Sequence, residues 1–311
     1  MRIAFLGAGG VGGYFAGRLA QAGRRVVLIA RGAHLDAIRR DGLHVQSVAG
    51  DFTTRDLEAT DTPTQAGQLD AVFVCTKAWQ LPEAAAALLP MLGPDTLVVP
   101  LQNGVEAPDQ LATLVGQRRV LGGLCRIVSF LDAPGRIRHA GLEPQLEFGE
   151  RDGRRTDRVA ALLAAFDGVQ GVAARVPDSI EAALWEKFLF IAPTSGVGAV
   201  TRVPIGEFRA IAESRQMLEA AIAEVATLAR ARGVPLSKDA IERTLQFVDS
   251  LPATATTSMQ RDLMEGRPSE LEAQSGAVVR LARAARVPVP VNECLYRALL
   301  PSELRARQGR R

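Results

Sequence analysis

The chain has 311 residues, of which 47% are hydrophobic and 23% are charged. This length suits about two domains, and the composition excludes a disordered chain, a collagen-like chain and a small disulfide-stapled protein. The net charge of +3 argues against a dedicated nucleic-acid-binding protein. The three cysteines (Cys75, Cys125 and Cys294) are far apart and are expected to be reduced thiols. The three histidines show no metal-ligand spacing, so no metal site is expected.

The N-terminus imitates a secretory signal, because an apolar stretch follows Arg2. The longest charge-free run, residues 3–17, is shorter than the about 20 residues that a membrane-spanning helix needs. It is also rich in glycine, which is a poor helix former. We therefore expect a cytoplasmic protein that begins with a strand and has no membrane or nucleic-acid partner.

The first half of the chain alternates between strands and helices. Val11, Phe15 and Leu19 mark one face of a helix that ends at Gly23. Residues 42–60 predict a small β excursion outside this alternation, and residues 135–149 also resemble strands. The pattern predicts an α/β fold, a doubly wound parallel sheet of Rossmann type with helices on both faces. Apolar runs predict its strands at residues 3–6, 25–30, 69–76, 96–101 and 120–128.

Helical periodicity dominates after Pro177, where the strand runs end. We therefore expect two domains, at residues 1–177 and 178–311, the second all-helical. The arginines at 305, 307, 310 and 311 are expected to form a frayed, solvated tail. Helices are predicted at residues 179–192, 212–232, 238–250 and 269–285, with prolines between them.

A glycine-rich stretch, Gly7-Ala8-Gly9-Gly10-Val11-Gly12, matches the pattern G-x-G-x-x-G. It follows a strand and opens a helix inside a β-α-β unit, which is the context of dinucleotide binding. Gly7 would permit the tight turn, Gly9 the approach of a pyrophosphate, and Gly12 close packing of helix on strand. The alternative is a structural turn without a ligand.

The end of the second strand indicates which dinucleotide binds. NAD enzymes usually place an acidic residue there, whereas this chain has Ala30-Arg31-Gly32 and no acid before Asp36. A guanidinium suits a 2′-phosphate in charge and geometry. Arg31 therefore predicts NADP(H), the alternative being an ordinary surface arginine.

Two further polar residues follow strand ends, the edge at which open α/β sheets bind ligands. Lys77 follows the strand at 69–76, and Asn103 follows the strand at 96–101. Either could contact cofactor or substrate. The alternatives are a solvated lysine and an Asn-Gly turn.

Lys187 lies on an apolar helical stripe with Ile180, Ala183, Leu184 and Ile191 as its neighbours at helical spacing. An ammonium is charged at neutral pH, so it could polarise a ketone and protonate the alkoxide that hydride attack produces. The alternative is a lysine that extends from the edge of a packed helix into solvent.

Glu270 and Ser258 also have two interpretations. Glu270, expected at a helix start, could bind a substrate or only complement the helix dipole. Ser258 could bind an anion or cap a helix.

Together these residues resemble the ketopantoate reductase (2-dehydropantoate 2-reductase) family over nearly the whole chain. The stretch from Ser258 to Glu270, continuing into residues 287–292, is the most specific part of the resemblance. The matching motifs are G-A-G-G-V-G from Gly7, C-T-K-A-W-Q from Cys75, Q-N-G from Gln102, L-W-E-K from Leu184 and S-M-Q-R-D-L-M-E-G-R-P-S-E from Ser258.

The resemblance implies a Rossmann domain and a helical domain, with NADPH and a 2-oxo acid in the cleft between them. It implies reduction of ketopantoate to pantoate on the way to pantothenate, and it suggests a homodimer. Lys187 would then be the general acid, Glu270 would hold the substrate hydroxyl, and Ser258 its carboxylate. The residues implied for the cofactor are Gly7, Ala8, Gly9, Gly10, Val11, Gly12, Arg31, Lys77 and Asn103, the last also beside the substrate.

Three substrate-lining asparagines of well-known members are replaced here, by Ile191, Ser195 and, approximately, Ala255. Ser195 stays a candidate substrate-binding residue. A pocket without those amides should favour a different or more apolar 2-oxo acid. Two alternatives therefore remain, a paralogous reductase of another ketoacid or ketone and a non-catalytic NADPH sensor.

Overall fold

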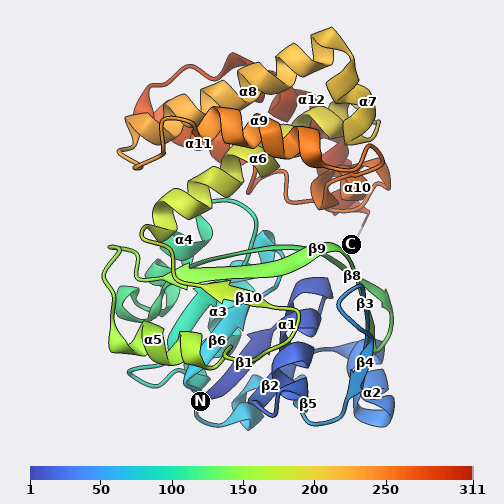
Figure 1. Cartoon of the computed structure of the whole chain (residues 1–311), viewed down its shortest axis with the longest axis vertical. Helices are drawn as coiled ribbons and strands as arrows, with labels where there is room; N and C mark the ends of the chain where they lie inside the picture. The colour runs from blue at the N-terminus through green and yellow to red at the C-terminus, as the bar shows by residue number, and fades with distance from the viewer. Residues whose placement is uncertain (310–311) are drawn as a thin grey trace. The chain divides into compact units, whose positions relative to one another are not determined.

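The computed structural model describes residues 1–309, apart from the side chain of Leu142. The internal contacts of the chain divide it into two compact units. The first contains Met1–Gln102 and Ala107–Ile180, and the second contains Asn103–Glu106 and Glu181–Arg311. Figure 1 shows strands predominating in the first unit and helices in the second.

The first unit is built on a five-stranded parallel sheet with the order β5-β2-β1-β6-β7. Its central strand β1 pairs with β2 on one side and with β6 on the other, and the predicted doubly wound fold is confirmed. The strands are β1 (Arg2–Leu6), β2 (Arg25–Ile29), β5 (Glu58–Thr60), β6 (Ala71–Val74) and β7 (Leu97–Pro100).

Both faces of this sheet are buried, which explains why its strands are continuous apolar runs. In β1, Ile3 and Phe5 join one core cluster, whereas Ala4 and Leu6 join the cluster on the opposite face. The stacked rings of Phe5 and Phe73, with centroids 5.0 Å apart, tie β1 to β6 inside the first cluster.

A second sheet has the order β10-β9-β3-β4, with β8 paired to β9 in antiparallel fashion. The strand predicted at 120–128 therefore belongs to this sheet and not to the parallel one, because an apolar run does not reveal which partner a strand pairs with. The predicted excursion at residues 42–60 is only partly right, because β5 belongs to the parallel sheet, beside β2. Three residues are too few to carry the apolar pattern of a buried strand. The strands of the second sheet are β3 (Leu43–Ser47), β4 (Phe52–Thr54), β8 (Gly122–Ala133), β9 (Arg136–Gly149) and β10 (Ala173–Arg175).

The helices of the first unit follow the strands as expected. The first ends before Gly23, which has a φ of +72°, a conformation that glycine adopts without strain. These helices are α1 (Gly10–Gln21), α2 (Gly32–Asp41), α3 (Leu81–Leu88), α4 (Ala107–Val115) and α5 (Asp157–Ala164), with short 3₁₀ turns at Pro63–Ala66, Ala78–Gln80, Leu89–Met91 and Gln117–Arg119.

The described part of the second unit is helical, as its periodicity predicted. The first helix does not end at Ala192, however, but continues through Pro193 as far as Thr201. Proline removes one helical hydrogen bond, yet the residues on both sides of it are buried, so tertiary packing holds the helix together. The helices are α6 (Ile180–Thr201), α7 (Ile205–Ala210), α8 (Ala212–Ala231), α9 (Ala240–Ser250), α10 (Ser258–Met264), α11 (Ser275–Ala285) and α12 (Pro290–Gln308).

The arginine-rich C-terminus differs from the frayed tail that we expected. Arg305 and Arg307 lie in the last turns of α12, and Arg307 Nη2 donates to Ser269 O at 3.1 Å. Arg307 also pairs with the buried carboxylate of Glu303. The tail assignment of residues 310 and 311 lies outside the described residues.

Among the helices of residues 1–309, none is both long and apolar enough to cross a bilayer.

Candidate functional site

The glycine-rich turn joins β1 to α1, and backbone conformation or close packing explains three of its glycines, Gly7, Gly10 and Gly12. Gly7 has a φ of +104°. A Cβ on Gly12 would lie 1.9 Å from Gly7 O and 3.0 Å from the Cβ of Cys75, so only glycine fits there. Gly10 is similarly constrained, since its Cβ would lie 2.4 Å from Ser129 O. This packing brings the start of α1 tightly against the sheet.

Gly9 differs from these neighbours, because a Cβ on it would meet no atom within 4 Å among the residues described. Gly9 is the N-cap of α1, and no side chain caps it. The first hydrogen bond of α1 runs from Gly13 N to Gly9 O at 2.8 Å, so the preceding N–H groups lack an intrahelical partner. Open space before unpaired N–H groups at a helix N-terminus suits the pyrophosphate of a dinucleotide. Ala8 lies in the turn between β1 and α1, and Val11 is the second residue of α1.

The stretch after β6 lies directly behind the turn. A Cβ on Gly7 would lie 3.0 Å from the backbone of Cys75 and Thr76. Burial, and to a smaller extent the neighbouring Cys125, raises the pKa of the Cys75 thiol well above its ordinary value, so this thiol stays protonated. Lys77 is half-buried, and its Nζ lies 5.8 Å from the centroid of the Trp79 ring. Cys75 and Lys77 therefore place a thiol and a lysine side chain at the carboxyl edge of the sheet, directly after β6.

Arg31 follows β2 as the N-cap residue of α2. Its side chain is exposed, and its Nη1 lies 2.8 Å from Glu83 Oε1 in an ion pair that is itself exposed. Exposed ion pairs contribute little to stability, so a stronger anion could displace Glu83. The guanidinium is therefore accessible to a ligand phosphate.

In the second unit, Lys187 lies on α6 and is half-buried. The apolar neighbours expected from helical spacing, Ile180, Ala183, Leu184 and Ile191, are all buried. The stem of Lys187 therefore emerges from a packed helix face.

Asn103 and Glu270 meet directly, although 167 residues separate them. Asn103 Nδ2 donates to Glu270 Oε2 at 3.2 Å, and Glu270 is 6% exposed. Glu270 is not at a helix start as predicted, because α11 begins only at Ser275. The turn at 271–274 breaks the helical pattern that the sequence suggested. Helix-dipole complementation therefore does not explain this carboxylate.

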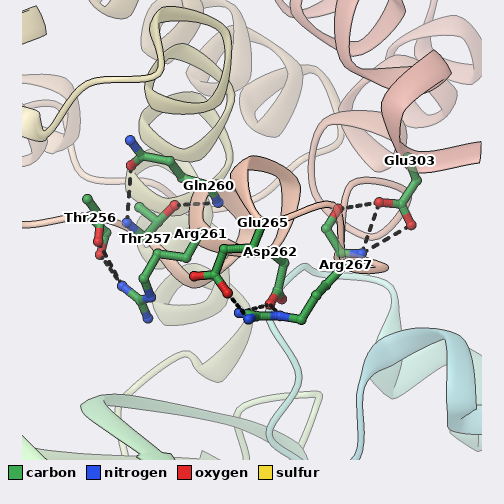
Figure 2. A network of polar contacts seen from close by, with 9 residues as sticks. Thr256, Thr257, Gln260, Arg261, Asp262, Glu265, Arg267 and Glu303 are labelled. Carbon is green, nitrogen blue, oxygen red and sulfur yellow. Dashed lines mark hydrogen bonds and ion pairs between the residues drawn. The ribbon is translucent and has the colours of Figure 1, made fainter. Parts of the chain in front are cut away.

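Two anchors fix this pair. Glu303 on α12 accepts hydrogen bonds from Ser269 N (2.9 Å) and Ser269 Oγ (2.6 Å), which immobilises the residue before Glu270. Arg280 on α11 binds Glu106 Oε2 at 2.8 Å and Glu272 Oε2 at 2.9 Å, which ties the segment after Asn103 to the same unit. Figure 2 shows the Glu303 contact beside the polar network of α10.

Ser258 is the first residue of α10, and it does not serve as the helix cap. Thr257 is the cap, since its side chain accepts from Gln260 N at 3.2 Å. Beside it, Arg261 Nη1 donates to Thr256 O and to Thr256 Oγ1 (Figure 2). Burial lowers the pKa of Arg261. With Thr257 acting as the cap, the half-buried Ser258 keeps its hydroxyl available for another role.

The structure also shows how far the three residues that replace the expected asparagines are buried. Ser195 on α6 is 0% exposed, Ile191 is buried, and Ala255 is half-buried. Ser195 Oγ has no hydrogen-bond partner in the part of the chain that the structure describes.

Sequence reasoning did not identify Gln274, nor the Arg280–Glu106 pair. Gln274 is a fully buried glutamine in the turn before α11. A polar residue between Ala273 and Ser275 gives no periodic signal, and ion-pair partners 174 residues apart cannot be matched from sequence. Within residues 1–309, no group of His, Cys, Asp or Glu side chains is arranged to hold a metal ion.

Comparisons with known proteins match both units. Residues 3–153 match the family model "Ketopantoate reductase PanE/ApbA", and residues 179–303 match its C-terminal counterpart. The chain is 34% identical over 293 residues to the 2-dehydropantoate 2-reductase of Halobacterium salinarum, covering 94% of this chain and 95% of that protein. It is 32% identical over 298 residues to the uncharacterized oxidoreductase YkpB of Bacillus subtilis, covering 95% and 97%.

A crystal structure of a PanE/ApbA family ketopantoate reductase from Ralstonia eutropha superimposes with a TM-score of 0.90. The two chains are 31% identical, and the alignment covers 99% of this chain and 100% of the other. The chain therefore belongs to the ketopantoate reductase family, whose members are oxidoreductases that use a nicotinamide dinucleotide.

Proposed function

We propose that this protein reduces a 2-oxo acid with NADPH, and that the acid is 2-dehydropantoate, giving pantoate for pantothenate synthesis in the cytoplasm. The observation that carries the proposal is the contact between Asn103 Nδ2 and Glu270 Oε2. It joins two residues that the family resemblance assigns to substrate, and it holds a buried carboxylate where a substrate hydroxyl could donate to it. We retain residues 1–177 and 178–311 as the proposed cofactor and substrate domains.

The cofactor would be held by the turn from Gly7 to Gly12, where Gly9 leaves space before the α1 N-terminus. Lys77 would contact the cofactor at the carboxyl edge of the sheet, and Asn103 both cofactor and substrate. Arg31 would exchange its exposed partner Glu83 for the 2′-phosphate of NADP(H), because a dianionic phosphate binds a guanidinium more strongly than a carboxylate does.

When bound, NADPH supplies the hydride that forms the new C–H bond at the keto carbon. The Lys187 ammonium donates a proton to the keto oxygen, so that the products are the 2-hydroxy acid and NADP⁺. The resulting neutral amine regains its proton from water. Glu270 would accept a hydrogen bond from the substrate hydroxyl, and Ser258 and Ser195 would contact the rest of the substrate. The proposal requires Lys187 to reach the carbonyl while the two units hold their ligands.

The test follows NADPH oxidation by absorbance with 2-dehydropantoate and a panel of other 2-oxo acids and ketones. We expect turnover of 2-dehydropantoate with the lowest KM in the panel. Lys187→Met should lower kcat by about a hundredfold or more, because general-acid catalysis contributes that much, while NADPH binding persists. A matched control is Lys238→Met, which should leave kcat unchanged.

Three outcomes would contradict parts of the proposal. Turnover of other 2-oxo acids only would indicate a paralogous reductase, which the replacements at Ile191 and Ala255 favour. NADPH binding without any turnover would indicate a sensor. A Lys187→Met variant with nearly normal kcat would remove Lys187 from the role of general acid.

A further inference from the structure

Gln274 is a buried glutamine whose side-chain amide makes no hydrogen bond within the described chain. It is 0% exposed, and neither Oε1 nor Nε2 has a partner. Burying an unpaired amide is costly, and buried polar groups in folded proteins almost always have partners. A fully unpaired amide in an otherwise well-packed helical unit therefore indicates a position that stability alone does not explain.

The same unit contains a glutamine that shows the ordinary arrangement. Gln260 is also 0% exposed, but its Nε2 donates to Val203 O at 2.8 Å and its Oε1 accepts from Thr257 N at 3.4 Å. Gln260 thus stabilises the start of α10. The comparison separates a glutamine whose amide has two partners from one whose amide has none in the described chain.

Gln274 lies beside the pair that carries the proposed function. Its backbone N–H donates to Glu270 O at 3.0 Å, which places it one turn after that carboxylate. A Cβ on Gly104 would lie 2.5 Å from Ala273 O, so the segment that starts with Asn103 packs against the residue before Gln274. The backbone of Gln274 is therefore part of the Asn103–Glu270 neighbourhood.

Helix α6, which packs against the chain after Gln274, also contains two unpaired polar atoms. Thr194 Oγ1 and Ser195 Oγ are buried and have no hydrogen-bond partner among residues 1–309. A Cβ on the next residue, Gly196, would lie 3.5 Å from Ser275 Oγ, so α6 contacts the chain directly after Gln274. This part of the chain therefore still contains buried polar atoms that can form hydrogen bonds, although Ile191, Ser195 and Ala255 replace the asparagines of well-known family members.

We infer that Gln274 is a specificity-determining residue, which hydrogen-bonds to a hydroxyl group on the side chain of the 2-oxo acid. This inference rests on the proposed function. In the proposed function the ketone oxygen takes a proton from Lys187, the carboxylate contacts Ser258, and the hydroxyl proton goes to Glu270. The acceptor that remains is the hydroxyl oxygen, to which Gln274 Nε2 can donate. A neutral amide does not compensate a buried ammonium, so this side-chain group is a hydroxyl rather than an amine.

The experiment compares two substrates that differ by one hydroxyl, 2-dehydropantoate and 3,3-dimethyl-2-oxobutanoate. The ratio of their kcat/KM values is measured with NADPH for the wild type and for Gln274→Leu. We expect the wild type to prefer the hydroxylated acid, and the variant to lose about tenfold of that preference, the effect of one hydrogen bond to a buried partner. An unchanged ratio would overturn the inference.

Thermal unfolding without ligand gives the second measurement. Gln274→Leu should unfold at a temperature about 3 °C higher than the wild type, because it removes a buried amide that has no partner. The matched control Gln260→Leu should unfold at a lower temperature, because it breaks two hydrogen bonds. A comparable fall for Gln274→Leu would mean that its amide is paired inside the protein, against the inference.

The two proposals fail in different ways. If the wild type turns over neither acid, the proposed function fails and the role of Gln274 fails with it. If the wild type is active but the ratio is the same in both proteins, only the role of Gln274 fails. Gln274→Met has a similar volume and provides the same two measurements if Gln274→Leu does not fold.

Discussion

At the scale of single residues, Arg31 and Glu83 test the choice of cofactor. Arg31→Ala should raise the Kd for NADPH by about tenfold to a hundredfold, the effect of one charge-assisted hydrogen bond, and leave the Kd for NADH nearly unchanged. Glu83→Gln should lower the Kd for NADPH by about twofold to fivefold, because an exposed ion pair no longer competes for the guanidinium. Titration of nicotinamide fluorescence measures both constants.

Glu83→Gln is the informative control, because it should change the Kd for NADPH in the direction opposite to Arg31→Ala. If Arg31 has no part in binding, neither substitution should discriminate between NADPH and NADH. Equal losses for both cofactors in Arg31→Ala would point to a structural effect on α2, and would refute the assignment of Arg31 to the 2′-phosphate.

At the scale of one element, the turn between β1 and α1 contains two glycines that are needed for different reasons. Gly12→Ala should destabilise the protein by about 3 kcal/mol, because its Cβ would lie 1.9 Å from Gly7 O. Gly9→Ala should leave stability within about 1 kcal/mol, because its Cβ meets nothing within 4 Å of the described chain. The same Gly9 variant should bind NADPH at least about tenfold more weakly, since the methyl group occupies the space before the N–H groups.

Chemical denaturation and cofactor titration separate these two effects. Normal NADPH affinity in Gly9→Ala would mean that the pyrophosphate does not approach this turn. Normal stability in Gly12→Ala would contradict the close packing of α1 on β1.

At the scale of the whole molecule, the chain leaves the sheet after β7 and contributes Asn103–Glu106 to the helical unit. Arg280 fastens this segment through Glu106 and through Glu272, whose Oε1 accepts from Tyr296 at 2.7 Å. Arg280→Met should therefore raise KM for the 2-oxo acid about threefold to tenfold by loosening Asn103, a modest effect because these ion pairs are partly solvated. Steady-state kinetics together with NADPH titration provide the measurement.

If Arg280 had only a structural role, Arg280→Met would lower the unfolding temperature without changing KM. Arg280→Lys should raise KM less than Arg280→Met does, because lysine retains the positive charge opposite Glu106. The control Arg297→Met removes an exposed pair with Glu293 on α12 and should leave KM unchanged.

The sequence by itself predicted four of the five strands of the parallel sheet, the glycine-rich turn with the helix after it, and the helices that correspond to α6, α8, α9 and α11. These features depend on local periodicity and on glycines within a few residues of one another, which a single sequence displays directly. It also identified Asn103, Lys187, Ser258 and Glu270 as candidates, through spacing and family resemblance. The passage of α6 through Pro193 was missed, because burial on both sides outweighs the local preference.

Only the tertiary structure decided which candidates meet and what surrounds them. The Asn103–Glu270 hydrogen bond spans 167 residues, and the Arg280–Glu106 bond spans 174. Sequence spacing cannot reveal such pairs, because they depend on how separate elements pack. The same holds for the two buried glutamines: Gln260 and Gln274 are chemically identical, and only the atoms around each amide distinguish a helix anchor from a proposed substrate contact.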